Sequence, residues 1–168
     1  MQKRDNGQFL IEKSVESLDK ELKNCIKGRT VLIGMGNELK QDDGVGVALA
    51  RRLKGKVKAD IIEAGSAPEN RLYSIVNLRP DTVLFIDAVA FGGQPGEARL
   101  FSYNELAVND FSTHRLSPAF LMDFLLQEKI SGVFLLGIQP AEIQFGREIS
   151  PEISASLERL ESILCSIF

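Results

Sequence analysis

Two neighbouring carboxylates, Asp42 and Asp43, lie in the segment VLIGMGNELKQDDGVGVALARRL. The apolar run at residues 30–35 predicts a buried strand, and residues 45–53 predict a helix. The two aspartates therefore lie between the first predicted strand of the chain and the helix that follows it. In open α/β sheets, ligands bind outside the carboxyl ends of the strands, so this turn is a candidate site.

The glycines of this turn do not match a phosphate-binding loop. Gly34 and Gly36 give G-x-G, but the third glycine of a dinucleotide fingerprint would fall at Leu39. Two carboxylates would also repel the anion that binds at a helix N-terminus. A metal ion or another cation is the guest that this turn favours.

Two further polar residues follow apolar runs in the same way. Asp87 ends the run 82–86, and His114 lies in a loop ahead of the helix that starts after Ser117. Asp43, Asp87 and His114 are far apart in sequence, so only the fold can bring them together. Two carboxylates and one imidazole suit a divalent transition ion and leave coordination positions open. Glu63, at the end of a second strand, is a further acid on the same edge.

Each of these residues also has a purely structural interpretation. Asp42 or Asp43 can cap the following helix, and Asp87 can cap the turn into FGGQPG. His114 can be a solvated loop residue, and Glu63 can be an acid on the rim that only assists. These alternatives stay open at the level of the sequence.

Other catalytic sets are absent from the sequence. It has no H-E-x-x-H, no G-x-S-x-G, and a single histidine. Cys25 and Cys165 fall on the apolar faces of predicted helices, where we expect buried, unreactive thiols and no disulfide.

The remaining segments predict a single α/β domain in which strands and helices alternate. We expect a mostly parallel twisted sheet with helices on both faces, a three-layer α/β/α sandwich. Ser66 with Glu69 and Ser150 are expected to cap helices, Ser117-Pro118 is expected to open a helix, and Phe120 is expected to face the core. Residues 1–28 are expected to form an N-terminal helical extension and residues 29–168 the α/β domain. The predicted strands are residues 30–35, 59–63, 82–86, 97–101 and 132–138.

The bulk composition excludes several classes of partner. The 168 residues carry a net charge of −3, which gives no electrostatic footprint for nucleic acid or anionic lipid. The charged N-terminus does not resemble a signal peptide, and no apolar stretch approaches the roughly 20 residues of a membrane span. We therefore expect no nucleic-acid or membrane partner and a cytoplasmic location.

Six blocks of the chain resemble the nickel–iron hydrogenase maturation endopeptidases. They occur in the order found in that family, and GSAPEN with GIQP most resembles the branch that matures hydrogenase 3, of the formate-hydrogenlyase type. Residues 1–28 lie outside the resemblance. The blocks are GMGNELKQDDGVG, EAGSAPEN, LRPDTVLFIDAV, PGEARLF, THRLSP and FLLGIQP.

The resemblance implies an endopeptidase that removes the C-terminal tail of a nickel–iron hydrogenase large-subunit precursor after nickel insertion. The nickel arrives with the precursor, and the same site is expected to accept cadmium or zinc in vitro. The metal-contacting and catalytic positions of the family fall on Asp43, Asp87 and His114. Substrate-binding roles are expected for Glu63 and Asp42, although the position of Glu63 is usually aspartate in the family.

Two other functions are alternatives to the protease. The first is a non-hydrolytic nickel-binding chaperone or assembly factor for the large subunit. The second is a nucleotide-binding domain, which Leu39 and the acidic turn disfavour.

Overall fold

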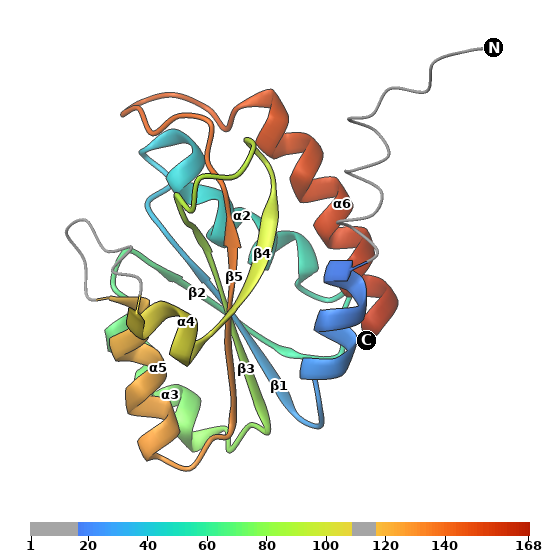
Figure 1. The fold of residues 1–168 in the computed structure, drawn as a ribbon, viewed down its shortest axis with the longest axis vertical. Coiled ribbons are helices and arrows are strands. Elements are labelled where there is room, and N and C mark those ends of the chain that lie inside the picture. Colours follow the sequence, from blue (N-terminus) through green and yellow to red (C-terminus); the bar gives the residue numbers. More distant parts are fainter. Residues whose placement is uncertain (1–16, 109–116) are drawn as a thin grey trace.

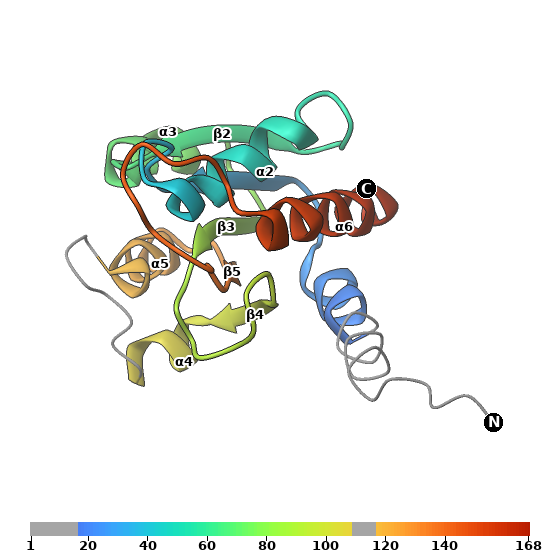
Figure 2. The same ribbon diagram turned by 90° about the horizontal axis from the view of Figure 1, so that it is seen from above.

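A computed structural model describes residues 17–108 and 117–168. Its described residues contain a five-stranded sheet covered on both faces by helices (Figures 1 and 2), which confirms the predicted three-layer α/β fold. The strands are β1 (Thr30–Met35), β2 (Asp60–Gly65), β3 (Thr82–Ala88), β4 (Ala98–Ser102) and β5 (Gly132–Ile138).

The helices divide into two layers. A helical segment at residues 17–25 packs with α2 (Val45–Leu53) and α6 (Pro151–Ile167) in one hydrophobic core. On the other face lie α3 (Leu72–Asn77), α4 (Tyr103–Val108) and α5 (Pro118–Gln127). Two short 3-10 helices, η1 (Gln41–Gly44) and η2 (Pro68–Arg71), come directly before α2 and α3. No helix among the described residues is both long and apolar enough to cross a bilayer.

Residues 31–33 of β1 and 83–86 of β3 are all apolar because both faces of the sheet are covered. Val31 and Ile33 of β1 lie in the core beneath α3 and α5, whereas Leu32 between them lies in the core beneath α2 and α6. In β3, Phe85 and Leu84 divide in the same way. A strand buried on both faces therefore shows a continuous apolar run rather than alternation.

The strand order is β2-β1-β3-β5-β4, with β4 antiparallel to β5 and the other pairs parallel. The chain runs from β1 outward to β2 and then returns past β1 to β3. The connections from β1 and β2 therefore leave over opposite faces of the sheet, through α2 and α3. This reversal makes the gap between the carboxyl ends of β1 and β3 a topological switch point, where such sheets bind ligands.

The predicted helix starts are confirmed in part. Ser66 and Glu69 do not form a capping box, since η2 starts at Pro68 and has no side-chain cap. Helix α5 opens at Ser117-Pro118 as predicted, and the Ser117 side chain also caps it by accepting from the Ala119 amide. Ser150 precedes α6 but makes no side-chain cap, because its hydroxyl donates to Asp42 instead.

Two predictions of burial are also wrong. Phe120 is 53% exposed, and Met122 takes the buried position on α5 instead. Cys165 is exposed and Cys25 is partly exposed; both are free thiols, and partial burial raises the pKa of Cys25.

The described part of the N-terminal segment buries Leu18 and Leu22 against the domain, and the boundary at residue 28 stays a prediction.

Candidate functional site

The candidate site begins where β1 and β3 separate. Their last paired residues are Gly34 and Ile86, and the pairing of β1 with β2 shifts register between Gly34 and Met35. Strand β3 continues for two more residues beside β5, and Asp87 pairs there with Gly137. Asp87 therefore lies at the switch point, beyond the last residue that β1 pairs with.

Helix α2 begins directly above the ends of these two strands. A Cβ on Gly46 would lie 2.0 Å from the Ile86 carbonyl oxygen and 2.4 Å from the Met35 carbonyl oxygen. Only glycine permits this approach, because any side chain would push the first turn of α2 away from the sheet. The close contact fixes η1, which directly precedes α2, against the carboxyl ends of β1 and β3.

Gly36 joins the two predicted acids. It has a φ of +122°, and a Cβ there would lie 1.8 Å from the Asp43 carbonyl oxygen and 3.5 Å from Asp87 Oδ1. The backbone of Asp43 and the carboxylate of Asp87 thus meet around one glycine, although 44 residues separate them in the sequence.

Backbone amides orient both carboxylates. The amide of Asn37 donates to Asp43 Oδ2 at 2.9 Å, and the amide of Ala88 donates to Asp87 Oδ1 at 2.9 Å. Both residues are only half-buried. Their directions are thus set by the local backbone, while neither side chain is sealed inside the core.

The third predicted metal ligand, His114, lies outside the described residues. Across residues 17–108 and 117–168, no three His, Cys, Asp or Glu side chains are grouped so as to hold a metal. The pair of acids fits part of the predicted donor set, and metal binding by Asp43, Asp87 and His114 stays a prediction.

Asp42 has a different environment from its neighbour. Its side chain is fully buried, and its two oxygens accept from the amides of Ala141, Glu142 and Ser150 at 2.8–3.1 Å. The Ser150 hydroxyl adds bonds of 2.9 and 2.7 Å to Oδ1 and Oδ2. The carboxylate thus links η1 to the β5–α6 loop, a structural role that leaves it unable to contact a substrate in this conformation.

Glu63 is bound by a residue that the sequence did not single out. Arg51 donates to Glu63 from Nε at 3.0 Å and Nη2 at 2.8 Å, and to Glu38 from Nη1 at 2.7 Å. Its hydrogen bonds to Glu38 hold the pKa of that carboxyl below its usual range. A substrate group that binds Glu63 would therefore compete with Arg51. The sequence signals available for this pair were a carboxylate four residues before the DDG sequence and an arginine on the following helix.

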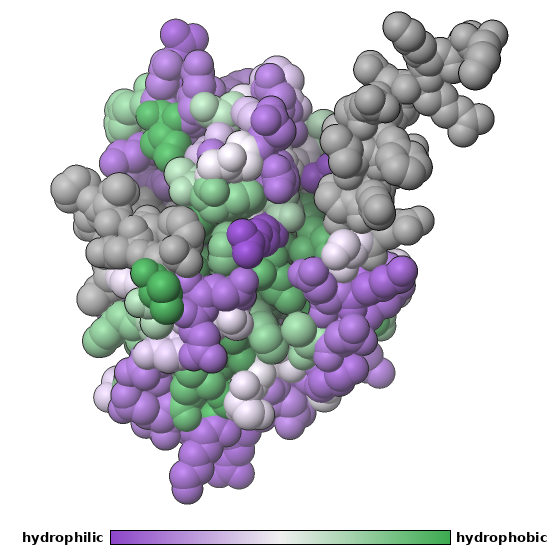
Figure 3. Space-filling model, viewed as in Figure 1, coloured by the Kyte–Doolittle hydropathy of each residue, from purple (hydrophilic) through white to green (hydrophobic). Residues whose placement is uncertain are grey.

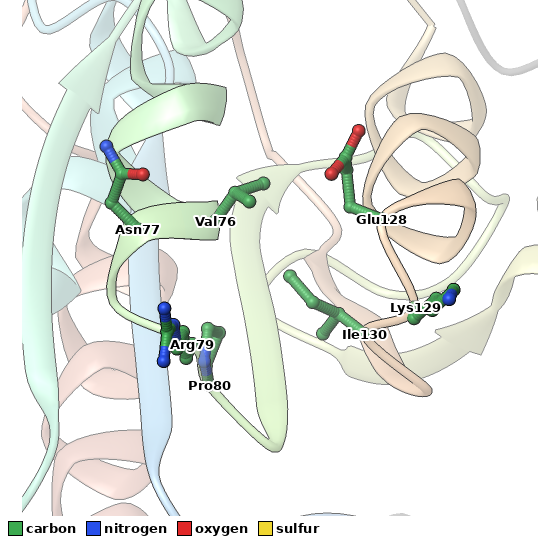
Figure 4. Close-up of a pocket in the computed structure, with 7 residues that line it drawn as sticks. All are labelled: Val76, Asn77, Arg79, Pro80, Glu128, Lys129 and Ile130. Carbon is green, nitrogen blue, oxygen red and sulfur yellow. The ribbon is translucent and has the colours of Figure 1, made fainter.

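A hollow of about 460 Å³ lies at the opposite end of the sheet (Figure 4). It is lined by Asn77, Arg79 and Pro80 ahead of β3 and by Glu128 and Lys129 ahead of β5. Because these residues precede the strands, the hollow is separated from the acids by the length of the sheet and does not belong to the candidate site.

Comparison with known proteins identifies the family. The sequence profile of the hydrogenase maturation proteases matches residues 44–167, a range that includes Asp87 and begins one residue after Asp43. The hydrogenase 3 maturation protease of Escherichia coli K12 is 36% identical over 131 residues, which cover 76% of this chain and 83% of that protein. The chain belongs to the hydrogenase maturation protease family.

Further relatives of the protease agree in sequence and in fold. A putative hydrogenase maturation protease of Methanocaldococcus jannaschii is 33% identical and aligns with 90% of this chain and 94% of its own length. The crystal structure of a [NiFe] hydrogenase maturation protease from Thermococcus kodakarensis KOD1 superposes with a TM-score of 0.81 at 32% identity. That superposition covers 88% of this chain and 97% of the other. The protein is thus a hydrolase, which disfavours the chaperone and nucleotide-binding interpretations.

Proposed function

We propose that this protease removes the C-terminal tail of a nickel–iron hydrogenase large-subunit precursor after nickel insertion, and that it recognises the bound nickel. The observation that carries the proposal is the meeting of Asp43 and Asp87 at Gly36, at the switch point of the sheet. His114 is proposed as the third ligand. Membership of the family supports peptide-bond hydrolysis as the reaction, and the position of the two acids supports the proposed site.

Oxygen donors oriented in advance suit an ion that arrives with the substrate. Nickel in the precursor keeps ligands of its own, so the protease needs only a partial set with open positions. The amides of Asn37 and Ala88 hold the two carboxylates before the substrate binds, which lowers the entropy cost of recognition. Precursor without nickel would bring no ion for these carboxylates to bind, so the unloaded form would lose that part of the recognition.

The water that attacks the scissile bond requires a base. We assign this role to Asp43 rather than Asp42, because a fully buried carboxylate bonded to three amides and a hydroxyl cannot reach water. Asp43 is half-buried and lies at the edge that the substrate approaches. In this proposal Asp42 stabilises the turn, and Asp43 activates the water.

A mass measurement of the precursor tests the proposal. Wild-type protease should shorten nickel-loaded precursor and leave nickel-free precursor intact. Asp43→Asn, Asp87→Asn and His114→Ala should each abolish shortening without loss of fold. The matched control is Asp60→Asn, which removes an exposed carboxylate on β2 that pairs with Arg29. This variant should cleave the precursor normally.

Two results would contradict the proposal in different ways. Tight binding of loaded precursor without any change of mass would point to an assembly factor that does not hydrolyse its partner. Equal cleavage of loaded and unloaded precursor would remove nickel from recognition while leaving the protease activity in place.

A further inference from the structure

Three large apolar side chains are exposed in two loops beside the candidate site. Leu39 is 63% exposed in the turn between β1 and η1, and Ile143 and Phe145 are 52% and 76% exposed in the loop between β5 and α6. We call these three residues the apical patch. Figure 3 shows apolar surface at the upper left of the molecule, the end at which the β5–α6 loop crosses in Figure 1. Single exposed hydrophobic residues are ordinary, but three on adjoining loops need an explanation.

The two loops are joined by hydrogen bonds. The Gly146 amide donates to the Leu39 carbonyl at 2.9 Å, and the Asp42 amide donates to the Glu142 carbonyl at 3.4 Å. The buried Asp42 carboxylate also accepts from the amides of Ala141 and Glu142. These bonds hold the backbones of the two loops together, so a partner need not order the loops on binding.

One residue of the apical patch lies in the same turn as Asp43 of the candidate site. Leu39 lies four residues before Asp43. Asn37 is hydrogen-bonded to both residues. The Asn37 side chain accepts from the Leu39 amide at 2.9 Å, and the Asn37 amide donates to Asp43 Oδ2. A chain lying across the acids at the switch point would thus meet the patch next.

We propose that the apical patch binds apolar side chains of the polypeptide substrate close to the scissile bond. This inference rests on the proposed function, which requires a polypeptide at the acids. Its occupant is an apolar stretch of the precursor, because the three side chains offer apolar contact area next to a site that must hold an extended chain. The patch fixes the position of the substrate, and the acids act on it.

Affinity for the nickel-loaded precursor tests the proposal independently of cleavage. In an Asp43→Asn background, which does not cut, Ile143→Ser with Phe145→Ser should weaken binding by about 10- to 100-fold, the range expected for two central apolar anchors. Tyr73→Ser is the matched control, since Tyr73 is 75% exposed but lies on α3, on the opposite face of the sheet. It should bind as the parent does. In the cleaving protein, the double substitution should raise KM and leave kcat within about twofold.

Each outcome decides a separate question. Unchanged affinity in the double variant, with its melting temperature preserved, overturns the role of the patch whether or not the precursor is cut. Weakened affinity supports the patch even if wild-type protein leaves the precursor uncut, a result that would overturn the proposed function alone. A wild-type dimer that the double substitution converts to a monomer, with precursor binding unchanged, would make the patch a contact between copies and also overturn the proposal.

Discussion

Replacing Asp42 by alanine tests the structural role of this acid, which distinguishes it from Asp43. The carboxylate is fully buried and accepts from three amides and one hydroxyl that lie about 100 residues away in the chain. The Ser150 amide and hydroxyl are buried, whereas the amides of Ala141 and Glu142 are only partly buried, where water can replace the lost acceptor. Truncation therefore leaves buried donors at Ser150 without an acceptor.

The expected cost follows from those donors. An orphaned buried donor costs about 1–3 kcal/mol, and hydrogen bonds to a charged group contribute more than neutral ones. The two buried donors of Ser150 together with the partly buried amides give a total of about 3 kcal/mol, since such contributions do not add fully. For a chain of this size that corresponds to a fall in melting temperature of roughly 6–12 °C.

Urea denaturation of four variants measures the effect. Asp42→Asn should cost nearly as much as Asp42→Ala, because its NH₂ group would face donors where an acceptor is needed. Ser150→Ala should cost about 1 kcal/mol, since it removes the hydroxyl but leaves the amide bond to Asp42. Asp43→Asn should cost less than about 1 kcal/mol, because the oxygen of the new amide can still accept from Asn37.

An Asp42→Ala variant as stable as the wild type would contradict the structural role of this carboxylate. So would an Asp43→Asn variant that is more destabilised than Asp42→Ala. In that case the assignment of a structural and a functional role to these neighbouring acids would have to be reversed.

Three further predictions concern the framework of the site. Gly46→Ala should destabilise the protein by roughly 1–3 kcal/mol in urea and slow cleavage, because its Cβ would lie 2.0 Å from the Ile86 carbonyl oxygen; wild-type behaviour would contradict the tight seating of α2. Glu38→Gln should cost under about 1 kcal/mol at neutral pH, because the bond from Arg51 is exposed to solvent. Since that bond lowers the pKa of Glu38 in the folded state, its contribution is present above the ordinary value of 4.5 and is lost as pH falls through the folded pKa; a cost that persists in stronger acid would contradict it. Gln139→Ala should cost about 1–2 kcal/mol without changing KM, because its side-chain oxygen accepts from three successive amides at residues 91–93; a large change in KM would place it in the substrate site.

The elements that matter most for the site could be predicted from local sequence. Strands β1 and β5 and helix α2 have the predicted bounds, since continuous apolar runs end abruptly at glycine-containing turns or polar residues. The edge on which Asp87 lies follows from the same pattern. The strand order does not, because periodicity reports which faces are buried and not which strand lies beside which.

The different environments of Asp42 and Asp43 could not be predicted from their identical chemistry. A 3-10 turn places successive side chains about 120° apart, so one of two neighbours points inward while the other faces the sheet edge. The inward partner is the Ser150 segment, more than 100 residues later, and no local pattern shows that contact. The same long-range contact explains why Ser150, predicted to cap α6, uses its hydroxyl elsewhere.

A crystal of the protease soaked in cadmium would show whether Asp43, Asp87 and His114 bind one metal ion together. We predict one ion at the switch point between β1 and β3, bound by the carboxylates of Asp43 and Asp87 and by the imidazole of His114. An ion held by other residues, with Asp43 and Asp87 turned away from each other, would contradict the claim that these groups form the nickel-recognition site.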